Sequence, residues 1–399
     1  MSNKKTNAIF YAYSNNALDH LAPYAVLCKK KKMSCTVIYG EDFVRLKIRP
    51  RNNIIQIFKD YNISTYNIIS IGKKGFIQSI FNYIWCLANI IENYQFIPTF
   101  FKNKIKGLCY NFFFNLNGEL IGKNAAIKLL ENTDKVLVFI DSWSQNKKIQ
   151  NGFLSYVKGK ATIISTNHTP WHFHHTQRTK PSSFSEDVAF VSNKWEADAK
   201  NYIKNKEIVG TLRYSKKWLS TLNKYNKETI VNEDNKKNVL VLAHNETHTS
   251  DWKRMMDLLH KLSMKKDLNL RILPHIRGMI NMEPPKGLEK AWDKTTTLDV
   301  AVKNSDIVIF WTTSAIFEAV VRNKKIFYLS FLSNLDGDYI WQKDAPTNII
   351  IKNEKELFNE IIKYEKKDLP NNSCFQKIIW PEGDPWSNAS IFLDKYLTK

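Results

Sequence analysis

The run SDIVIFWTTSAIFEAVVRNKKIFYLS, residues 305–330, predicts a strand, a tight turn, a helix and a second strand in close succession. Thr312, Thr313 and Ser314 follow the first strand directly, before the helical pattern starts at Ala315. Backbone N–H groups at a helix N-terminus, with hydroxyls beside them, suit a bound phosphate. The alternative is that these hydroxyl residues only cap the helix.

Upstream, the run LNLRILPHIRG, residues 268–278, predicts another strand whose end carries His275 and Arg277. Parallel sheets bind ligands beyond the carboxyl ends of their strands. Arginine makes bidentate contacts to phosphate, and histidine can donate to a departing diphosphate, although a lone histidine at a strand end is usually structural. Glu318, in the helix after Ser314, is expected to accept from a ribose or sugar hydroxyl or simply to interact with the helix dipole. Together the two strand ends predict a nucleotide-sugar site.

The length of 399 residues exceeds the usual size of one hydrophobic core, so two domains are expected. Strand-like and helix-like segments alternate along the chain, which is typical of an α/β fold with largely parallel sheets. We expect strands at residues 8–14, 34–39, 68–71, 135–141, 161–166, 188–192, 239–243 and 307–310, another at Leu270 that ends near His275, and a last one that closes the run 305–330. Helices are expected at residues 18–30, 77–94, 195–204, 252–264 and 298–303 and from 315 onward.

The net charge of +21 predicts a polyanionic neighbour, although a composition rich in Lys, Asn and Ile also fits an A+T-rich genome. No recognised DNA-binding or RNA-binding motif accompanies the charge, so nucleic acid is not expected as a partner. The apolar stretch 76–101 is interrupted too often by polar residues to span a bilayer. Its apolar residues fall near helical spacing and Lys102, Lys104 and Lys106 follow, so it fits a core-facing helix or a helix lying on an anionic membrane.

Three short segments resemble bacterial surface-polysaccharide enzymes grouped with the CDP-glycerol glycerophosphotransferases and the UDP-N-acetylglucosamine 2-epimerases. They are VGTLRYSKKW at 209–218, PHIR at 274–277 and TTSAIFEA at 312–319. By architecture the resemblance covers most of the chain, but its motifs concentrate in residues 209–329. It implies a GT-B fold, in which two Rossmann-like domains face each other across a cleft.

The resemblance also implies how the domains divide the work. Residues 1–215 would bind the acceptor and residues 238–375 the nucleotide donor, with a polar linker at 216–237. Residues 376–399 would pack back on the first domain. Donor binding is expected from His275, Arg277, Thr312, Thr313, Ser314 and Glu318.

The implied activity is the transfer of a sugar from a nucleotide-activated donor to an anionic or lipid-linked bacterial surface glycan. The enzyme would be cytoplasmic and peripheral on the membrane. The alternatives are a CDP-alditol-dependent glycerophosphotransferase, a UDP-sugar epimerase and, outside enzymes, a nucleic-acid-binding protein.

The base for such a transfer is expected in the first domain, because an inverting reaction needs a proton acceptor beside the acceptor hydroxyl. Asp19 and His20 follow the first strand, and His168 follows the strand at 161–166. Trp171, His172 and His174 would line the acceptor loop. No metal is expected, since this histidine-rich loop has no nearby Cys and no HExxH spacing, and GT-B enzymes typically need none.

Other chemistries lack their signatures in this sequence. Neither GxGxxG nor a P-loop is present, which argues against an NAD enzyme or an ATPase, and no cofactor is expected. The one DxD-like run, residues 336–338, reads as a plain turn. The five cysteines show no metal-ligand spacing and are expected to be buried thiols: Cys28, Cys35, Cys86, Cys109 and Cys374.

Overall fold

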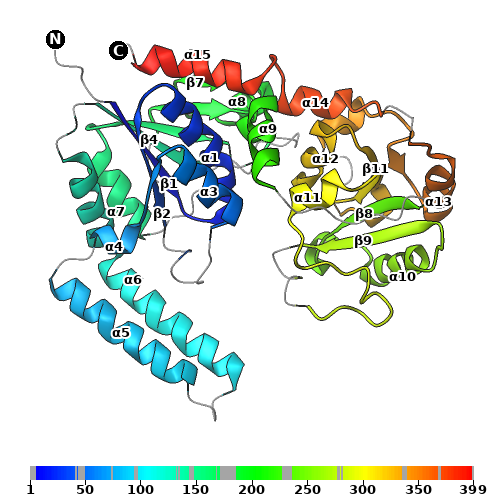
Figure 1. Cartoon of the computed structure of the whole chain (residues 1–399), viewed down its shortest axis with the longest axis horizontal. Coiled ribbons are helices and arrows are strands. Elements are labelled where there is room, and N and C mark those ends of the chain that lie inside the picture. Colours follow the sequence, from blue (N-terminus) through cyan, green and yellow to red (C-terminus); the bar gives the residue numbers. More distant parts are fainter. Residues whose placement is uncertain are drawn as a thin grey trace. The chain divides into compact units, whose positions relative to one another are not determined.

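The computed structural model describes residues 6–40, 43, 50–72, 75–93, 98–131, 133, 135–142, 148–167, 169–170, 186–226, 236–275, 279, 282–334, 339–366 and 370–397. The chain divides into two compact units. Unit 1 holds residues 1–169, 177–225 and 382–399, and unit 2 holds residues 170–176 and 226–381. Each unit is built around one parallel sheet (Figure 1).

The sheet of unit 1 has the strand order β3-β2-β1-β4-β5-β6-β7, and every neighbouring pair is parallel. The chain builds one half outward from β1 and then returns to start the other half at β4. The point where the order reverses therefore lies between β1 and β4, and ligands bind at such points in open α/β sheets. The strands are β1 (Thr6–Ala12), β2 (Ser34–Tyr39), β3 (Ser64–Asn67), β4 (Lys135–Asp141), β5 (Thr162–Thr166), β6 (Val188–Val191) and β7 (Lys206–Ile208).

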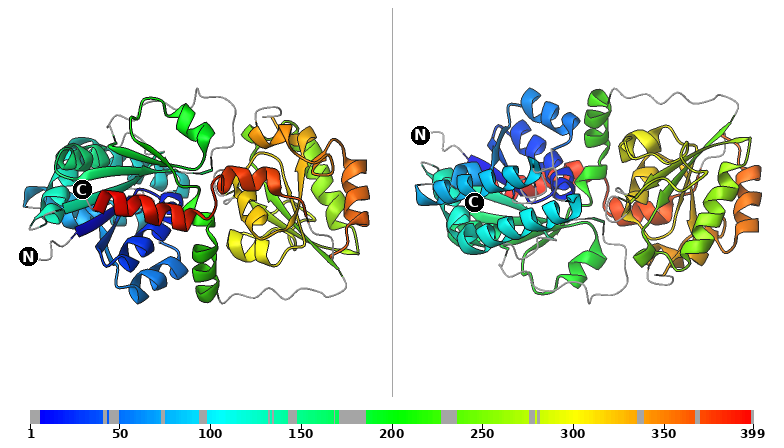
Figure 2. Two further views of the ribbon diagram at one scale, coloured as in Figure 1. Left: turned by 90° about the horizontal axis from the view of Figure 1, so that it is seen from above. Right: turned by 90° about the horizontal axis from the view of Figure 1, so that it is seen from below.

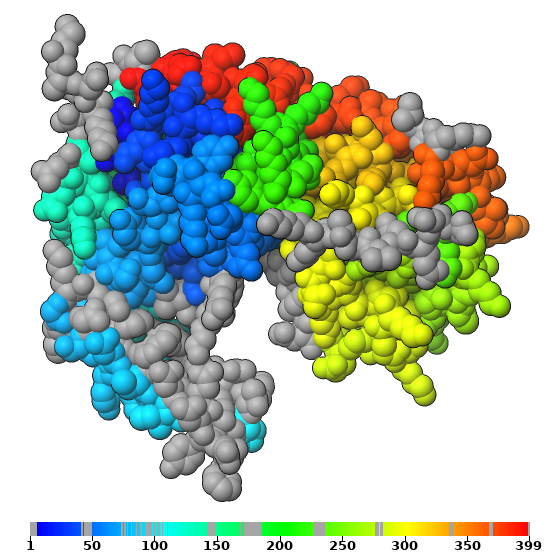
Figure 3. All heavy atoms as spheres, viewed as in Figure 1, coloured from blue at the N-terminus to red at the C-terminus, as the bar shows by residue number. Residues whose placement is uncertain are grey.

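Alternate residues of β1 enter two separate cores, one on each face of this sheet. Phe10 belongs to the core that also holds residues of α1, α3, α9 and α15, whereas Tyr11 belongs to the core formed with α4, α5, α6 and α7. In Figure 3, α15 (red) lies beside α1 (blue), and Lys31 after α1 pairs with Asp394 of α15 at 2.6 Å. The helices are α1 (Asn15–Lys30), α3 (Asn52–Asp60), α4 (Ile68–Gly72), α5 (Phe76–Asn93), α6 (Thr99–Leu130), α7 (Lys148–Val157), α8 (Lys194–Ala199), α9 (Lys216–Tyr225) and α15 (Pro385–Leu397).

The helices α5 and α6 lie side by side and extend away from the sheet of unit 1 (Figures 1 and 2). The carboxyl half of α6 packs into the core, where Ile121, Ala125 and Ala126 are fully buried. Within the described residues, no helix is both long enough and apolar enough to cross a bilayer.

The sheet of unit 2 has the order β12-β11-β10-β8-β9 and is parallel throughout. Its order reverses between β8 and β10, so the binding edge is expected beyond these two strands. The strands are β8 (Lys237–Ala243), β9 (Leu268–Pro274), β10 (Ile307–Phe310), β11 (Lys325–Leu329) and β12 (Ile350–Ile351). The helices are α10 (Trp252–Ser263), α11 (Leu298–Lys303), α12 (Phe317–Val321), α13 (Glu354–Lys363) and α14 (Ser373–Ile379).

The α/β class with two Rossmann-like parallel sheets is confirmed, but several local predictions are wrong. Residues 68–71 form helix α4 rather than a strand; the Asn67 side chain accepts from the N–H of Ile69 at 2.9 Å and starts the helix. A short apolar run does not by itself distinguish a buried helix from a buried strand. Of the five cysteines, Cys86 is exposed and Cys109 is only half-buried.

The segment 216–237, predicted to be a polar linker, is not a linker throughout, because its first ten residues form helix α9. Trp218 and Leu219 are buried on one face of α9, and Leu222 packs beside them, so this segment belongs to the core of unit 1. The segment 376–399 is divided: α14 belongs to unit 2, whereas α15 packs on unit 1 through Trp386 and Leu393.

Candidate functional site

Three imidazole rings gather beyond the carboxyl ends of β8 and β9. His244 follows β8 directly and His275 follows β9 directly, and their rings stack at 4.0 Å with an angle of 22°. His248, in the short 3-10 helix Glu246–His248, meets the ring of His244 edge-on at 4.4 Å. The sequence analysis overlooked His244, although it has the same strand-end position as His275.

The predicted turn of hydroxyl residues lies at the end of β10. The Thr313 hydroxyl accepts from the N–H of Ala315 at 3.2 Å and caps the 3-10 helix Ser314–Ile316, which leads into α12. Thr312 is buried, and its hydroxyl lies 3.4 Å from that of Ser333. Ser314 is half-buried at the start of the turn. Capping therefore accounts for the Thr313 side chain and is compatible with an anion at the N–H groups.

Hydrogen bonds join the loops after β8, β10 and β11 along one edge of the sheet. The indole N–H of Trp311, after β10, donates to the hydroxyl of Thr249, after β8, at 3.1 Å. The N–H of Ser250 donates to the carbonyl of Leu332, after β11, at 3.0 Å. Because these loops flank the point where the strand order reverses, His275 and the turn at 312–314 share the expected binding edge.

Glu318 is engaged in a buried ion pair within α12. Its Oε1 accepts from Nε of Arg322 at 2.9 Å and lies 2.9 Å from Nη2 of the same guanidinium group, and only 2% of Glu318 is exposed. A buried charged group that loses its partner is strongly destabilising, so each member of this pair is required by the other. This contact explains Glu318 without any ligand, and a sugar contact by the same residue stays a prediction.

In unit 1, Asp19 and His20 lie on the first turns of α1, beyond the end of β1. The carboxylate of Asp19 is buried and pairs with Arg51 at 3.1 Å and with Arg213 at 3.8 Å. Arg213 comes from the segment VGTLRYSKKW and also donates to the side chain of Asn16 at 3.4 Å. His20, the residue after Asp19, is also buried. Two cationic groups thus meet one carboxylate at the reversal point of the first sheet.

Two further polar residues at this edge were missed by the sequence analysis. Asp141 ends β4 and Asn167 follows β5, and each is only 1% exposed. The Asn167 amide donates to the hydroxyl of Thr211 at 3.0 Å. Their signal was the same as that of His275, a polar residue directly at the end of a buried strand.

Several predicted site residues lie outside the described residues: Arg277, His168, Trp171, His172 and His174. In the part of the chain that the structure describes, no group of three or more His, Cys, Asp or Glu side chains is arranged to hold a metal ion.

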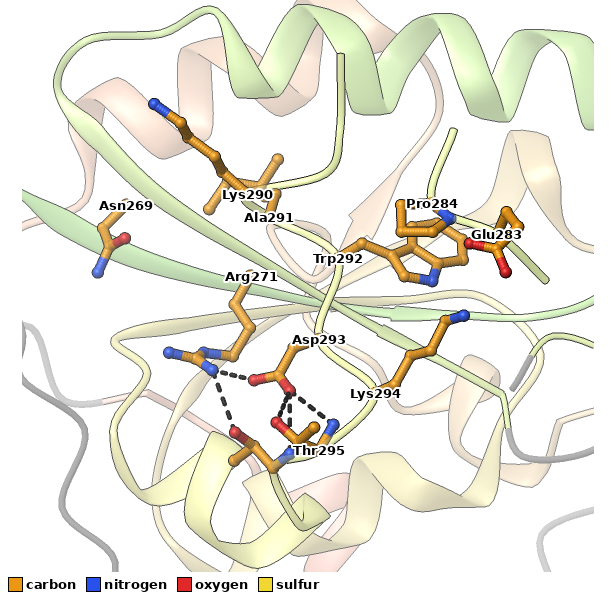
Figure 4. A pocket seen from close by; sticks show the side chains of 12 residues that line it. Asn269, Arg271, Glu283, Pro284, Lys290, Ala291, Trp292, Asp293, Lys294 and Thr295 are labelled. Carbon is orange, nitrogen blue, oxygen red and sulfur yellow. Dashed lines mark hydrogen bonds and ion pairs between the residues drawn. The ribbon is translucent and has the colours of Figure 1, made fainter. Parts of the chain in front are cut away.

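A separate hollow of about 510 Å³ lies beside the edge strand β9 (Figure 4). Arg271 on β9 forms an ion pair with Asp293 and donates to the hydroxyl of Thr296 at 3.3 Å. Burial raises the pKa of Asp293, but hydrogen bonds from Thr296 and Thr295 outweigh it, so this pKa lies well below its usual value. The hollow lies along the strand and not at its carboxyl end, where His275 is found.

No family model and no curated protein matches this sequence. Solved structures match nearly the whole chain. The UDP-GlcNAc 2-epimerase from Methanocaldococcus jannaschii is 11% identical, with 98% of this chain and 99% of that chain covered and a TM-score of 0.52. The wall teichoic acid polymerase TagF, soaked with CDPG, is 12% identical, with 99% and 88% covered and a TM-score of 0.52.

A third match, the glycosyltransferase of kitacinnamycin, is 8% identical, with 98% of this chain and 99% of that chain covered and a TM-score of 0.52. At these identities the likeness establishes the fold. The chain has the GT-B fold, so the resemblance stated from three short segments is confirmed at the level of the fold.

Proposed function

We propose that this chain is a metal-independent glycosyltransferase that moves a sugar from a nucleotide-activated donor to a bacterial surface glycan. The observation that carries the proposal is the polar edge of unit 2, where His275 stacks on His244 and hydrogen bonds join the loops after β8 and β10. This edge lies at the reversal point of a parallel sheet, the place where such sheets bind nucleotides.

The donor's diphosphate would lie against the turn at residues 312–314. Its oxygens would accept from the N–H groups at the start of the 3-10 helix and from the hydroxyl of Ser314. His275 would donate to the bridging or terminal oxygen on which negative charge grows as the sugar leaves. Stacking on His244 would hold the His275 ring in place for this contact. Arg277 would add a bidentate phosphate contact.

The acceptor would bind to unit 1. A general base needs an unoccupied lone pair within hydrogen-bond reach of the acceptor hydroxyl. Arg51 and Arg213 both contact Oδ2 of Asp19, so neither ion pair occupies Oδ1, and the two cations would also attract an anionic acceptor. Asp19, His20 and His168 are therefore the proposed bases.

The remaining assignments complete the acceptor side. Trp171, His172 and His174 would contact the acceptor sugar, since aromatic and imidazole rings stack well on sugar faces. The enzyme would act at the inner face of the membrane on a lipid-linked or otherwise anionic glycan.

Thermal denaturation with CMP, CDP, UDP, GDP and TDP tests the donor site. A nucleotide present at about 100 times its Kd stabilises the folded state by about 2.7 kcal/mol, which raises the melting temperature measurably. His275→Ala and Ser314→Ala should abolish the shift while leaving the ligand-free melting temperature within a few degrees. His260→Ala on α10 is the matched control and should keep the shift. If both site variants keep the full shift, the assignment of the donor site is wrong.

The nucleotide that binds and the product then separate the related activities. Binding of CDP together with a phosphodiester product would replace the proposal with a glycerophosphotransferase. Conversion of UDP-N-acetylglucosamine incubated alone with the enzyme would replace it with an epimerase. A glycosidic product formed only when both donor and acceptor are present supports the proposal.

A further inference from the structure

The hairpin of α5 and α6 exposes an unusual number of large apolar side chains to solvent. Soluble monomers seldom expose a contiguous apolar patch of this kind without a function. The most exposed are Tyr83 and Leu116 at 67%, Phe112 at 66% and Leu108 at 61%. Among the side chains that the structure describes in this hairpin, the exposed large apolar ones are Tyr83, Ile90, Phe101, Ile105, Leu108, Phe112, Leu116 and Leu120.

On α6 the exposed residues form one stripe. Phe101, Ile105, Leu108, Phe112 and Leu116 follow one another at intervals of three or four residues, which places them on one face of a helix. From Phe101 to Leu116 the stripe is about 22 Å long at 1.5 Å per residue.

A different face of the same helix fills the core of unit 1. Phe113, Phe114 and Ile121 of α6 are buried there, against α4 and α7. The stripe is therefore additional to the apolar face that folding requires. In the part of the chain that the structure describes, the stripe residues are not members of this core, so a binding role explains their exposure better than packing does.

The charge of the hairpin indicates what covers the stripe. Residues 76–118 contain Lys102, Lys104 and Lys106 but only one acidic residue, Glu92, which leaves a net charge of +2. A second copy of the chain docked symmetrically would bring the same lysines together, which is unfavourable. An anionic surface would attract them, and the whole chain carries +21.

We infer that the stripe on α6, together with the exposed Tyr83 and Ile90 of α5, is the surface by which this protein lies on an anionic lipid membrane. The helices would rest in the plane of the interface with their apolar side chains among the acyl chains and their lysines at the headgroups. The inference rests on the proposed function only for the membrane-linked acceptor. Vesicle binding needs no donor nucleotide, so the two can fail separately.

Flotation with phosphatidylcholine vesicles, with and without phosphatidylglycerol, tests the inference. The wild-type protein should float with the anionic vesicles. Leu108→Glu combined with Phe112→Glu should lower the partition coefficient at least about tenfold, because two anchoring side chains are replaced by repelled charges. Ile362→Glu on α13, which is equally exposed at 64% in unit 2, is the matched control and should bind as the wild type does.

The exposed thiol of Cys86 on α5 supplies a second measurement. A polarity-sensitive fluorophore attached there, in a Cys109→Ser background, should shift to the blue when anionic vesicles are added. Lys104→Glu should weaken binding to anionic vesicles about tenfold and leave binding to neutral vesicles unchanged.

Three results would overturn the inference. The first is flotation of the double variant at the wild-type level. The second is no spectral shift at Cys86 while the protein floats. The third is a wild-type dimer in light scattering that the double variant converts to a monomer, because a second copy would then cover the stripe. Since both replaced side chains are exposed, an unchanged melting temperature confirms that the variants are folded.

Discussion

Replacing Gly122 with Ala should destabilise unit 1, because α6 and α7 cross at this residue with almost no space between their backbones. A Cβ atom on Gly122 would lie 2.0 Å from the carbonyl oxygen of Ile149 and 2.6 Å from the backbone nitrogen of Phe153. Gly152 on α7 meets the backbone of Glu119 in the same way, at 2.1 Å. The obstacles are backbone atoms, so the helices themselves would have to separate.

The size of the effect follows from this geometry. For the new Cβ to lie at an ordinary 3.4 Å from the carbonyl oxygen of Ile149, α6 and α7 must move apart by about 1.4 Å. The side chains of Ile149 and Phe153 on α7 are fully buried, so this movement would disturb the core. Overpacking a well-packed core costs about 1–3 kcal/mol, and a rigid obstacle favours the upper end. Alanine recovers about 0.5–1 kcal/mol of helix propensity. We expect a net loss of about 2 kcal/mol, or roughly 4–8 °C in melting temperature for a unit of this size.

Differential scanning calorimetry measures this loss, and Gly107→Ala is the matched control within the same helix. Among the described residues, and apart from its chain neighbours and its own helix backbone, no atom lies within 4 Å of the Cβ that alanine would place at Gly107, so this variant should be as stable as the wild type or slightly more stable. If Gly122→Ala melts at the temperature of Gly107→Ala, the close crossing of α6 and α7 is wrong.

Two further predictions concern titrating groups. At mildly alkaline pH a thiol reagent should modify the exposed Cys86 rapidly, whereas Cys35 and Cys374 should react only after unfolding. Burial raises the pKa of Cys35 to about 12 and that of Cys374 to about 11, so few of these thiols are ionised. Rapid reaction of either buried thiol in a timed assay with an aromatic disulfide would contradict this. Because the pKa of Asp293 is lowered on folding, its carboxylate stabilises the protein fully above the unfolded value of 3.8, and this contribution is lost as the pH falls from that value through the lower pKa of the folded state. The melting temperature of Asp293→Asn should therefore lie below that of the wild type at pH 7, and the gap should narrow in acid. A constant gap would refute the role of the hydrogen bonds from Thr296 and Thr295.

Much of unit 2 could be predicted from the sequence, because its strands are short apolar runs bounded by polar residues. The expected strand at 307–310 and the helix at 298–303 match the structure residue for residue. The turn at 312–314 was equally readable, since three hydroxyl residues directly follow a buried strand. These features depend on neighbours in the chain, so a local pattern is enough to indicate them.

The local pattern failed where packing decided the outcome. Three of the residues at 68–71 are buried isoleucines because α4 packs into the core of unit 1, and such a run looks the same in a strand. Helix α9 was hidden in a polar segment because only a few of its residues, including Trp218, face the core. The long helix α6 was not expected at all. It carries apolar residues on two faces, so the sequence does not show the alternation of apolar and polar residues that marks an ordinary surface helix.

What the sequence by itself determined is the alternation of strands and helices, the two parallel sheets and the polar residues that end β1, β9 and β10. Only the tertiary structure decided which strand ends become neighbours. Strand order arises from contacts between residues far apart in the chain: β10 pairs with β8, so Trp311 reaches Thr249, and β8 pairs with β9, so His244 stacks on His275. For the same reason Asp19 acquires its partners Arg51 and Arg213 only when distant segments of unit 1 fold together.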